Sequence, residues 1–229
     1  MQTGRIVAIH KDEGGGNTLT LDAPISESLT PGQYLLINIP DQPDAVFSLP
    51  LFPGGIHTQT WVPGFPTPKP DAWIPGTTIT LRGPLGSGFR PPREATRFAL
   101  AAFGNTSSRL LPLTGLALQK NCAVALFTNA PQPSLPPAIE IQPLEALPTA
   151  LSWADYLAVD IPYSQLTLLH SYLPGTSEGP LPCVAQALII MPMPCGGIAD
   201  CGACAVPTRK GYKLACKDGP VFDLNEVDW

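Results

Sequence analysis

The sequence predicts an antiparallel β-barrel, then a parallel α/β domain, then a short cysteine-rich C-terminal module. Residues 1–92 carry short strand-like segments separated by Gly, Pro and Asp. Residues 93–190 alternate apolar runs with segments of helical spacing, a pattern typical of a parallel sheet. Residues 191–229 gather most of the cysteines. Hydrophobic residues make up 44% of the 229 residues and charged residues 14%, which is enough to fill two modest cores.

Strand candidates in the barrel region are rich in β-branched and aromatic residues. They are RIVAIH, NTLTLDA, QYLLINIP, AVFSLPLF, IHTQTWV and TTITLRG. Turn-forming groups such as GGGN, TPGQ and PGTT separate them. About six short strands at this spacing favour a small barrel or sandwich.

The pattern of residues changes near PLGSGFRPPREATR, where adjacent prolines and a polar run mark a domain boundary. The apolar runs RFALAAF, AVALFTN, IEIQPLE, ADYLAVDI and CVAQALIIMPM are expected to be strands. The segments SSRLLPLTGLALQKN and YSQLTLLHSYL are expected to be helices. A doubly wound sheet is the architecture that this order predicts.

The cysteine cluster carries the strongest chemical signal. Its spacing, C-x5-C-x2-C-x11-C, is formed by Cys195, Cys201, Cys204 and Cys216. A [2Fe–2S] cluster needs four thiolates, and plant-type ferredoxins use a C-x4-C-x2-C…C loop that differs by one residue. Nearby Gly196, Gly197 and Gly202 allow tight turns that aim N–H groups at sulfur.

Two other interpretations of these cysteines remain open. Four thiolates also bind structural zinc, although zinc ribbons favour two C-x2-C pairs and this chain has one. Disulfides are less consistent with clustered cysteines and no visible export signal. The same reasoning predicts a cytoplasmic location. Cys122 and Cys183 stand alone in apolar runs and are expected to be buried small hydrophobes.

The tail CGGIADCGACAVPTRKGYKLACKDGPVF resembles the C-terminus of the electron-transfer subunit of class-B dihydroorotate dehydrogenase. Upstream, PGQYLLINIP and GPLGSGF resemble segments of that family's ferredoxin-reductase-like barrel. The order of barrel, α/β domain and cluster is also the family's. The resemblance implies FAD on the barrel, NAD on the α/β domain and a cluster that passes electrons to a catalytic dehydrogenase subunit.

The resemblance also implies flavin-binding residues. The family's R-x-[YF]-S motif corresponds here to Ala45, Val46, Phe47 and Ser48, so the aromatic and the serine match but the arginine is missing. An arginine fork commonly binds a diphosphate, so FAD binding is expected to be weakened or arranged differently. Phe47 has an alternative role as a barrel core residue. The remaining flavin candidates are Gly64 and Thr67 of an expected phosphate-contacting turn, and Gly83, Pro84, Leu85 and Gly86.

The nicotinamide site departs further from the family. The first α/β strand meets a turn with Gly104 as its single glycine, where several would let a pyrophosphate approach the backbone. Asn105, Thr106 and Ser107 are therefore expected to cap a helix. The later strand ends in LAVDIPYS, without the family's C-G-P-like turn. NAD(P) is accordingly not expected as a cofactor.

The predicted function is electron relay between a flavin and a [2Fe–2S] cluster, with no catalytic residue in this chain. Two alternatives remain: an NAD(P)H-dependent reductase subunit, or a non-catalytic assembly subunit with a structural cluster. A net charge of −5 without a basic stripe argues against nucleic acid as a partner. No apolar run reaches 18 residues, so no membrane span is expected. The three histidines lie far apart and suggest no site.

Overall fold

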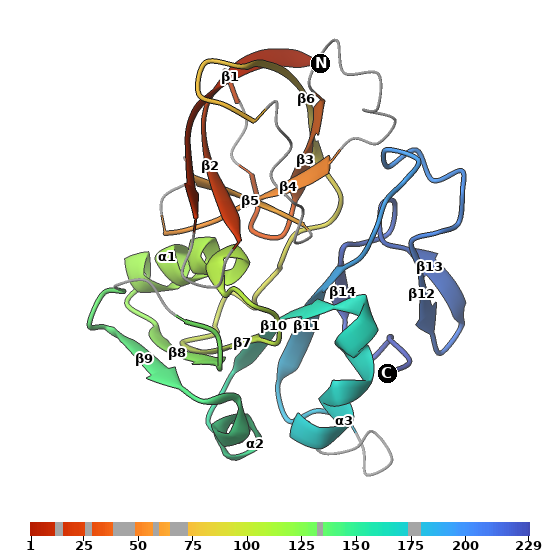
Figure 1. Cartoon of the computed structure of the whole chain (residues 1–229). Coiled ribbons are helices and arrows are strands. Elements are labelled where there is room, and N and C mark those ends of the chain that lie inside the picture. The colour runs from red at the N-terminus through yellow and green to blue at the C-terminus, as the bar shows by residue number, and fades with distance from the viewer. Residues whose placement is uncertain are drawn as a thin grey trace.

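A computed structural model describes residues 1–11, 16–25, 29–38, 49–56, 60–64, 73–131, 135–173 and 180–229. Within these residues the chain forms a barrel, a six-stranded sheet and a small hairpin (Figure 1). None of the described helices is long and apolar enough to cross a membrane. The predicted combination of β-barrel and α/β sheet is confirmed.

The barrel closes in the order β1-β2-β5-β4-β3-β6, and every neighbouring pair is antiparallel. Its strands are β1 (Gln2–Lys11), β2 (Asn17–Asp22), β3 (Tyr34–Asn38), β4 (Leu49–Pro53), β5 (Thr60–Pro63) and β6 (Thr78–Leu85). Alternation along β2 illustrates the fold, because Leu19 and Leu21 are buried while Thr18 and Thr20 are half-buried. The inward side chains form one core around Trp61.

The larger sheet has the order β14-β11-β10-β7-β8-β9. Its parallel strands are β7 (Arg97–Ala102), β8 (Ala123–Thr128), β9 (Ile139–Gln142), β10 (Tyr156–Pro162) and β11 (Val184–Ile190). From β7 the chain runs outward to β8 and β9, and then returns to β10 on the other side. The carboxyl ends of β7 and β10 therefore define the switch point of the sheet, where ligands bind in open α/β folds.

Short helical segments connect these strands. They are η1 (Ser108–Leu110), α1 (Leu111–Gln119), η2 (Leu144–Ala146), α2 (Leu147–Ala150), η3 (Tyr163–Leu168) and α3 (Leu169–Tyr172). The two expected helical segments are confirmed. The strand expected over 139–145 was wrong in its last residues: β9 ends at Gln142, and a helical segment starts after Pro143.

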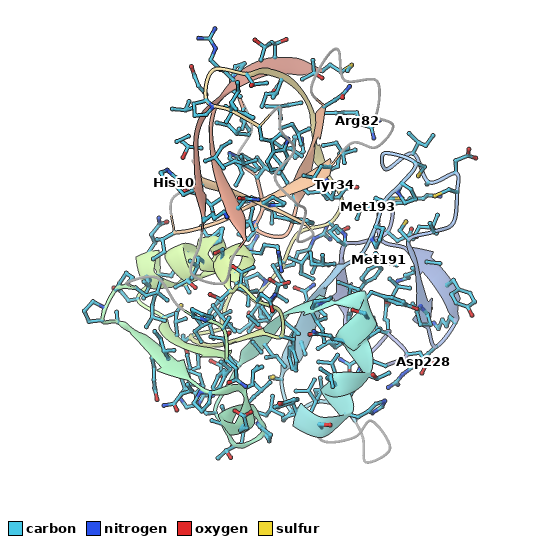
Figure 2. All side chains as sticks on the ribbon, viewed as in Figure 1. His10, Tyr34, Arg82, Met191, Met193 and Asp228 are labelled. Carbon is cyan, nitrogen blue, oxygen red and sulfur yellow. The ribbon has the colours of Figure 1, made fainter. Side chains whose placement is uncertain are left out.

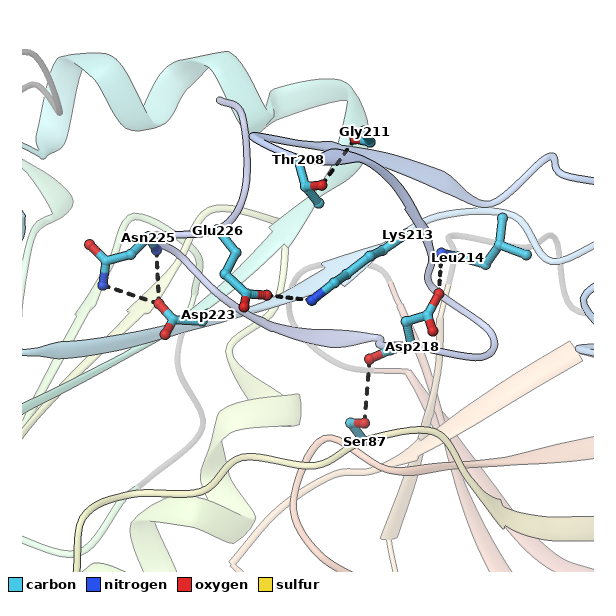
Figure 3. Close-up of polar contacts among 9 residues, drawn as sticks. All are labelled: Ser87, Thr208, Gly211, Lys213, Leu214, Asp218, Asp223, Asn225 and Glu226. Atoms are coloured by element: carbon cyan, nitrogen blue, oxygen red, sulfur yellow. Dashed lines mark hydrogen bonds and ion pairs between the residues drawn. The ribbon is translucent and has the colours of Figure 1, made fainter.

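The C-terminal segment folds back onto the sheet. The hairpin of β12 (Ala205–Thr208) and β13 (Gly211–Leu214) precedes β14 (Val221–Asp223), which pairs antiparallel with β11. Figure 3 shows Asp218 at the return: its carboxylate accepts from the Leu214 N–H at 2.8 Å, and its carbonyl accepts from the Ser87 hydroxyl at 3.4 Å. The tail is thus attached to both larger units, and domain boundaries near residues 92 and 190 stay predictions.

Candidate electron-transfer site

The hairpin brings two cysteines together. Cys204 precedes β12 and Cys216 follows β13, and the pairing of Ala205 with Leu214 sets them side by side. Their sulfur atoms lie 3.3 Å apart, and both residues are buried. This separation is well beyond the ~2.05 Å of a disulfide bond. Two buried thiols in contact are suited to bind one metal ion together.

A second pair forms in the preceding loop. Positive φ values of 63° at Gly196 and 72° at Gly197 turn the backbone so that later N–H groups face Cys195. The Asp200 N–H contributes most, with Cys201 next, and together these hydrogen bonds lower the pKa of Cys195 to about 6. The loop therefore favours a thiolate at Cys195, the form that binds iron.

The arrangement fits an iron–sulfur cluster. Cys195 shares a hydrogen bond with the Cys201 side chain, while Cys204 contacts Cys216, so the thiols form two pairs. Within the described ranges, no three His, Cys, Asp or Glu side chains gather tightly enough for a single metal ion. Burial raises the pKa of Cys216 to about 12, with the Cys204 hydrogen bond adding to the rise. A metal centre would supply the positive charge that this buried pair requires.

The two isolated cysteines lie elsewhere. Cys122 is buried directly before β8, and its thiol donates to the Ala95 carbonyl at 3.5 Å. Cys183 is half-buried before β11. Neither belongs to the cysteine loop.

The predicted flavin residues fall into three groups. Phe47, Ser48 and Thr67 lie outside the described residues. Gly64 lines a cavity between barrel and sheet. The segment from Gly83 to Gly86, including Pro84 and Leu85, lies instead at the end of β6, beside Tyr34 and the tail. Phe52, next to Gly64, packs against Tyr34, which lies next to Gly86, so these two aromatic rings connect the two described groups.

Gly86 is held closely by the tail. A Cβ atom at this position would lie 2.6 Å from Cδ of Pro220 and 2.9 Å from Cε1 of Tyr34. Its φ of 74° also requires glycine. The adjacent Ser87 N–H donates to the Gly219 carbonyl at 2.6 Å. This turn therefore joins the barrel to the segment that follows the fourth cysteine.

The cavity next to Gly64 has a volume of about 430 Å³ and opens at the switch point of the sheet. Asn17 and Gln165 line it from the barrel and from η3. Asn17 Oδ1 and Gln165 Oε1 are buried without a hydrogen-bond partner among the described residues. Such orphaned acceptors indicate a site for a ligand that donates N–H groups.

A buried ion pair closes one wall of this cavity. Arg109 Nε lies 2.9 Å from Asp160 Oδ2, and the side chains are 6% and 0% exposed. Arg109 also donates to the Pro63 carbonyl at 3.4 Å, which connects the sheet to the barrel. Burial raises the pKa of Asp160, and the charge of Arg109 opposes that rise. Sequence reasoning missed this pair because its members stand 51 positions apart.

The expected helix cap is wrong in detail. Ser107 occupies the N-cap position of η1 but makes no capping bond with its side chain. Thr106 Oγ1 instead accepts from the Ser108 N–H at 3.1 Å. Gly104, Asn105 and Thr106 nevertheless line the cavity.

Comparison with known proteins bears on the cysteine-rich tail and on the overall fold. Residues 192–228 match the iron-sulfur cluster binding domain of dihydroorotate dehydrogenase B. No curated protein sequence matches the chain.

Solved structures are similar in fold. A structure described for flavin-based electron bifurcation by NADH-dependent reduced ferredoxin-NADP oxidoreductase gives a TM-score of 0.71 at 16% identity. The match covers 99% of this chain and 90% of the other. A ferredoxin NADP+ reductase from Neisseria gonorrhoeae, with bound FAD and NADP, gives 0.56 at 10% identity, covering 82% and 98%. At these identities the likeness establishes the fold alone.

The chain therefore combines a ferredoxin-reductase-like fold with an iron–sulfur cluster binding domain, and this combination supports an electron-transfer subunit. Residues 192–228 are similar in sequence to the iron–sulfur domain of dihydroorotate dehydrogenase B, and the rest of the chain is similar to the solved structures in fold alone.

Proposed function

We propose that this chain relays electrons between FAD on the barrel and a [2Fe–2S] cluster, to or from a catalytic dehydrogenase subunit. The observation that carries the proposal is the division of the four cysteines into two pairs on a tail that matches an iron–sulfur domain. A binuclear cluster takes two thiolates on each iron, so two pairs suit it better than one tetrahedral zinc ion.

FAD is supported by the cavity at the switch point. Asn17 Oδ1 and Gln165 Oε1 are unpartnered acceptors, and the flavin ring carries an N–H that donates to such groups. Gly64 lines the same cavity. When bound, FAD supplies the exchange of electrons, and this chain's residues hold the ring and exclude water. Phe47, Ser48 and Thr67 stay predicted contacts of this cofactor.

We further propose that neither NADH nor NADPH is a direct hydride donor. A nicotinamide would have to lie in this cavity, which is lined by Arg109 and Pro162. Asp160 lies behind this lining, paired with Arg109. Pro162 has no N–H to offer a ligand, and the opposite turn retains only Gly104. The alternative, a complete NAD(P)H-dependent reductase, is favoured by the similar oxidoreductase whose description names NADH.

The experiment is chemical analysis of anaerobically purified protein together with visible and EPR spectra. We expect about two irons and two acid-labile sulfides per chain, as a binuclear cluster requires, together with FAD. Stoichiometric zinc without sulfide would refute the cluster. A redox-silent cluster with no flavin would favour the assembly subunit instead. The cytoplasmic location stays a prediction.

A further inference from the structure

Two barrel side chains meet the cysteine loop. Tyr34 begins β3, and Arg82 lies on the neighbouring strand β6, where it pairs with Leu36. The pairing of these strands is irregular between Tyr34 and Leu36. Figure 2 shows Tyr34 and Arg82 on the side of the barrel that faces the C-terminal segment.

Both residues bind backbone carbonyls beside cluster ligands. The Tyr34 hydroxyl donates to the carbonyl of Cys216 at 3.4 Å, and the Arg82 guanidinium donates to the carbonyl of Gly196, next to Cys195. The loop between these points packs closely on them. A Cβ atom at Gly197 would lie 3.2 Å from the Tyr34 hydroxyl oxygen and 3.4 Å from an Arg82 nitrogen. Arg82 thus contacts the backbone next to the Cys195 pair, and Tyr34 contacts the backbone of the Cys216 pair.

The other side of Tyr34 faces the predicted flavin turn. Its ring packs against Phe52 with centroids 5.7 Å apart and closely approaches Gly86. Tyr34 is fully buried. Its ring fills the space between the turn and the cysteine loop and keeps water out.

We propose that Arg82 and Tyr34 are positioning residues for electron transfer, with Arg82 also raising the reduction potential of the cluster. This inference rests on the proposed function. Reduction by one electron adds one negative charge to the cluster, and a nearby guanidinium stabilises the reduced state more than the oxidised state. Tyr34 holds the Cys216 end of the loop at a fixed distance from the barrel.

The test of Arg82 is an EPR-monitored redox titration of the full chain with its cluster. Arg82→Gln should lower the equilibrium constant for reduction on the order of tenfold, about 59 mV for one electron. Arg82→Lys keeps the charge and should return the potential toward that of the wild type. Arg209→Gln is the control, because it removes an exposed positive charge from the turn of the cluster hairpin.

A potential that shifts no further in Arg82→Gln than in Arg209→Gln would overturn the role of Arg82. If the Arg82→Gln variant does not retain the cluster, the Arg82→Lys variant tests the proposal. A wild-type reduction potential in Arg82→Lys supports the proposal. A lowered potential or a lost cluster overturns it. These outcomes require an intact wild-type cluster. Failure of the proposed function would instead appear as wild-type protein without labile sulfide.

The test of Tyr34 is the rate at which a chelator removes iron, together with the EPR line shape. Tyr34→Phe should release iron several-fold faster and broaden the lines, because the Cys216 end of the loop loses its tether. Its potential should stay near that of the wild type. Tyr212→Phe alters a tyrosine that is 78% exposed on the same hairpin and should change nothing. Equal release rates for the two variants would overturn the role of Tyr34.

Discussion

The Arg109 guanidinium and the Asp160 carboxylate form a buried ion pair where the ends of β7 and β10 meet the barrel. Both charges are removed from water, so each depends on the other. The pair occupies the part of the fold where related architectures bind ligands. Its stability and its effect on ligand choice can be tested separately.

Arg109→Met should destabilise the protein by about 3–5 kcal/mol at pH 8, because the Asp160 charge would stay buried without a partner. The loss should shrink at pH 5. Burial raises the folded pKa of Asp160 above its unfolded value, and removing Arg109 raises it further. Stability is then greatest below the unfolded pKa, near ~4, and falls as pH rises through the folded pKa. Urea unfolding at both pH values measures this.

The control for that experiment is Arg90→Met, at an exposed arginine of the segment between barrel and sheet. It should change the free energy of unfolding by less than about 0.5 kcal/mol at either pH. An Arg109→Met variant as stable as this control would contradict the assignment of a buried charge pair.

Cys216→Ser should lose the cluster or release it readily, because serine leaves the buried thiol of Cys204 without its pair. Cys122→Ser should retain iron and sulfide at wild-type levels, since Cys122 is buried away from the loop. Iron, sulfide and the visible spectrum distinguish the two variants. Equal retention in both would remove Cys216 from the ligand set.

Ala45→Arg should slow the dissociation of FAD. The change restores the arginine of the R-x-[YF]-S motif, whose guanidinium can bind a phosphate with two hydrogen bonds. Ala45 lies outside the described residues, so the alignment with the motif stays a prediction. Flavin fluorescence after dilution gives the dissociation rate, with Ala45→Lys as a variant that adds charge without the fork. No gain over Ala45→Lys would argue against a bidentate contact.

NADH and NADPH should not reduce the isolated protein within seconds. The nicotinamide would have to displace or avoid the Arg109–Asp160 pair, and Pro162 offers no N–H. Anaerobic stopped-flow mixing with excess nucleotide, observed at flavin and cluster wavelengths, measures the rate. Dithionite serves as the positive control for cofactors that can be reduced. Rapid reduction by either nucleotide would restore the complete-reductase alternative.

The sequence predicts well what depends on local pattern. The apolar runs of β7 and β8 and the β-branched residues of β2 identified their strands, and the cysteine spacing identified the cluster loop. Contacts between distant residues were not predictable in this way. Tyr34 and Cys216 are 182 positions apart, and no periodic signal links them. The role of Asp160 was not predictable for a second reason. It lies in the middle of an apolar strand, where a single aspartate gives no signal of an ion-pair partner.

The pairing of the short strand β14 was also not predictable from the sequence, because the three residues Val221–Asp223 are too few to show a periodic pattern. Its place beside β11 means that the cysteine loop starts from one sheet strand and ends at its neighbour. Both ends of the loop are therefore fixed to the sheet. In addition, β14 forms hydrogen bonds with backbone groups of β11 that would otherwise be free to pair with another chain. Detachment of this three-residue strand would release the cysteine loop from the sheet and expose the edge of β11 at the same time.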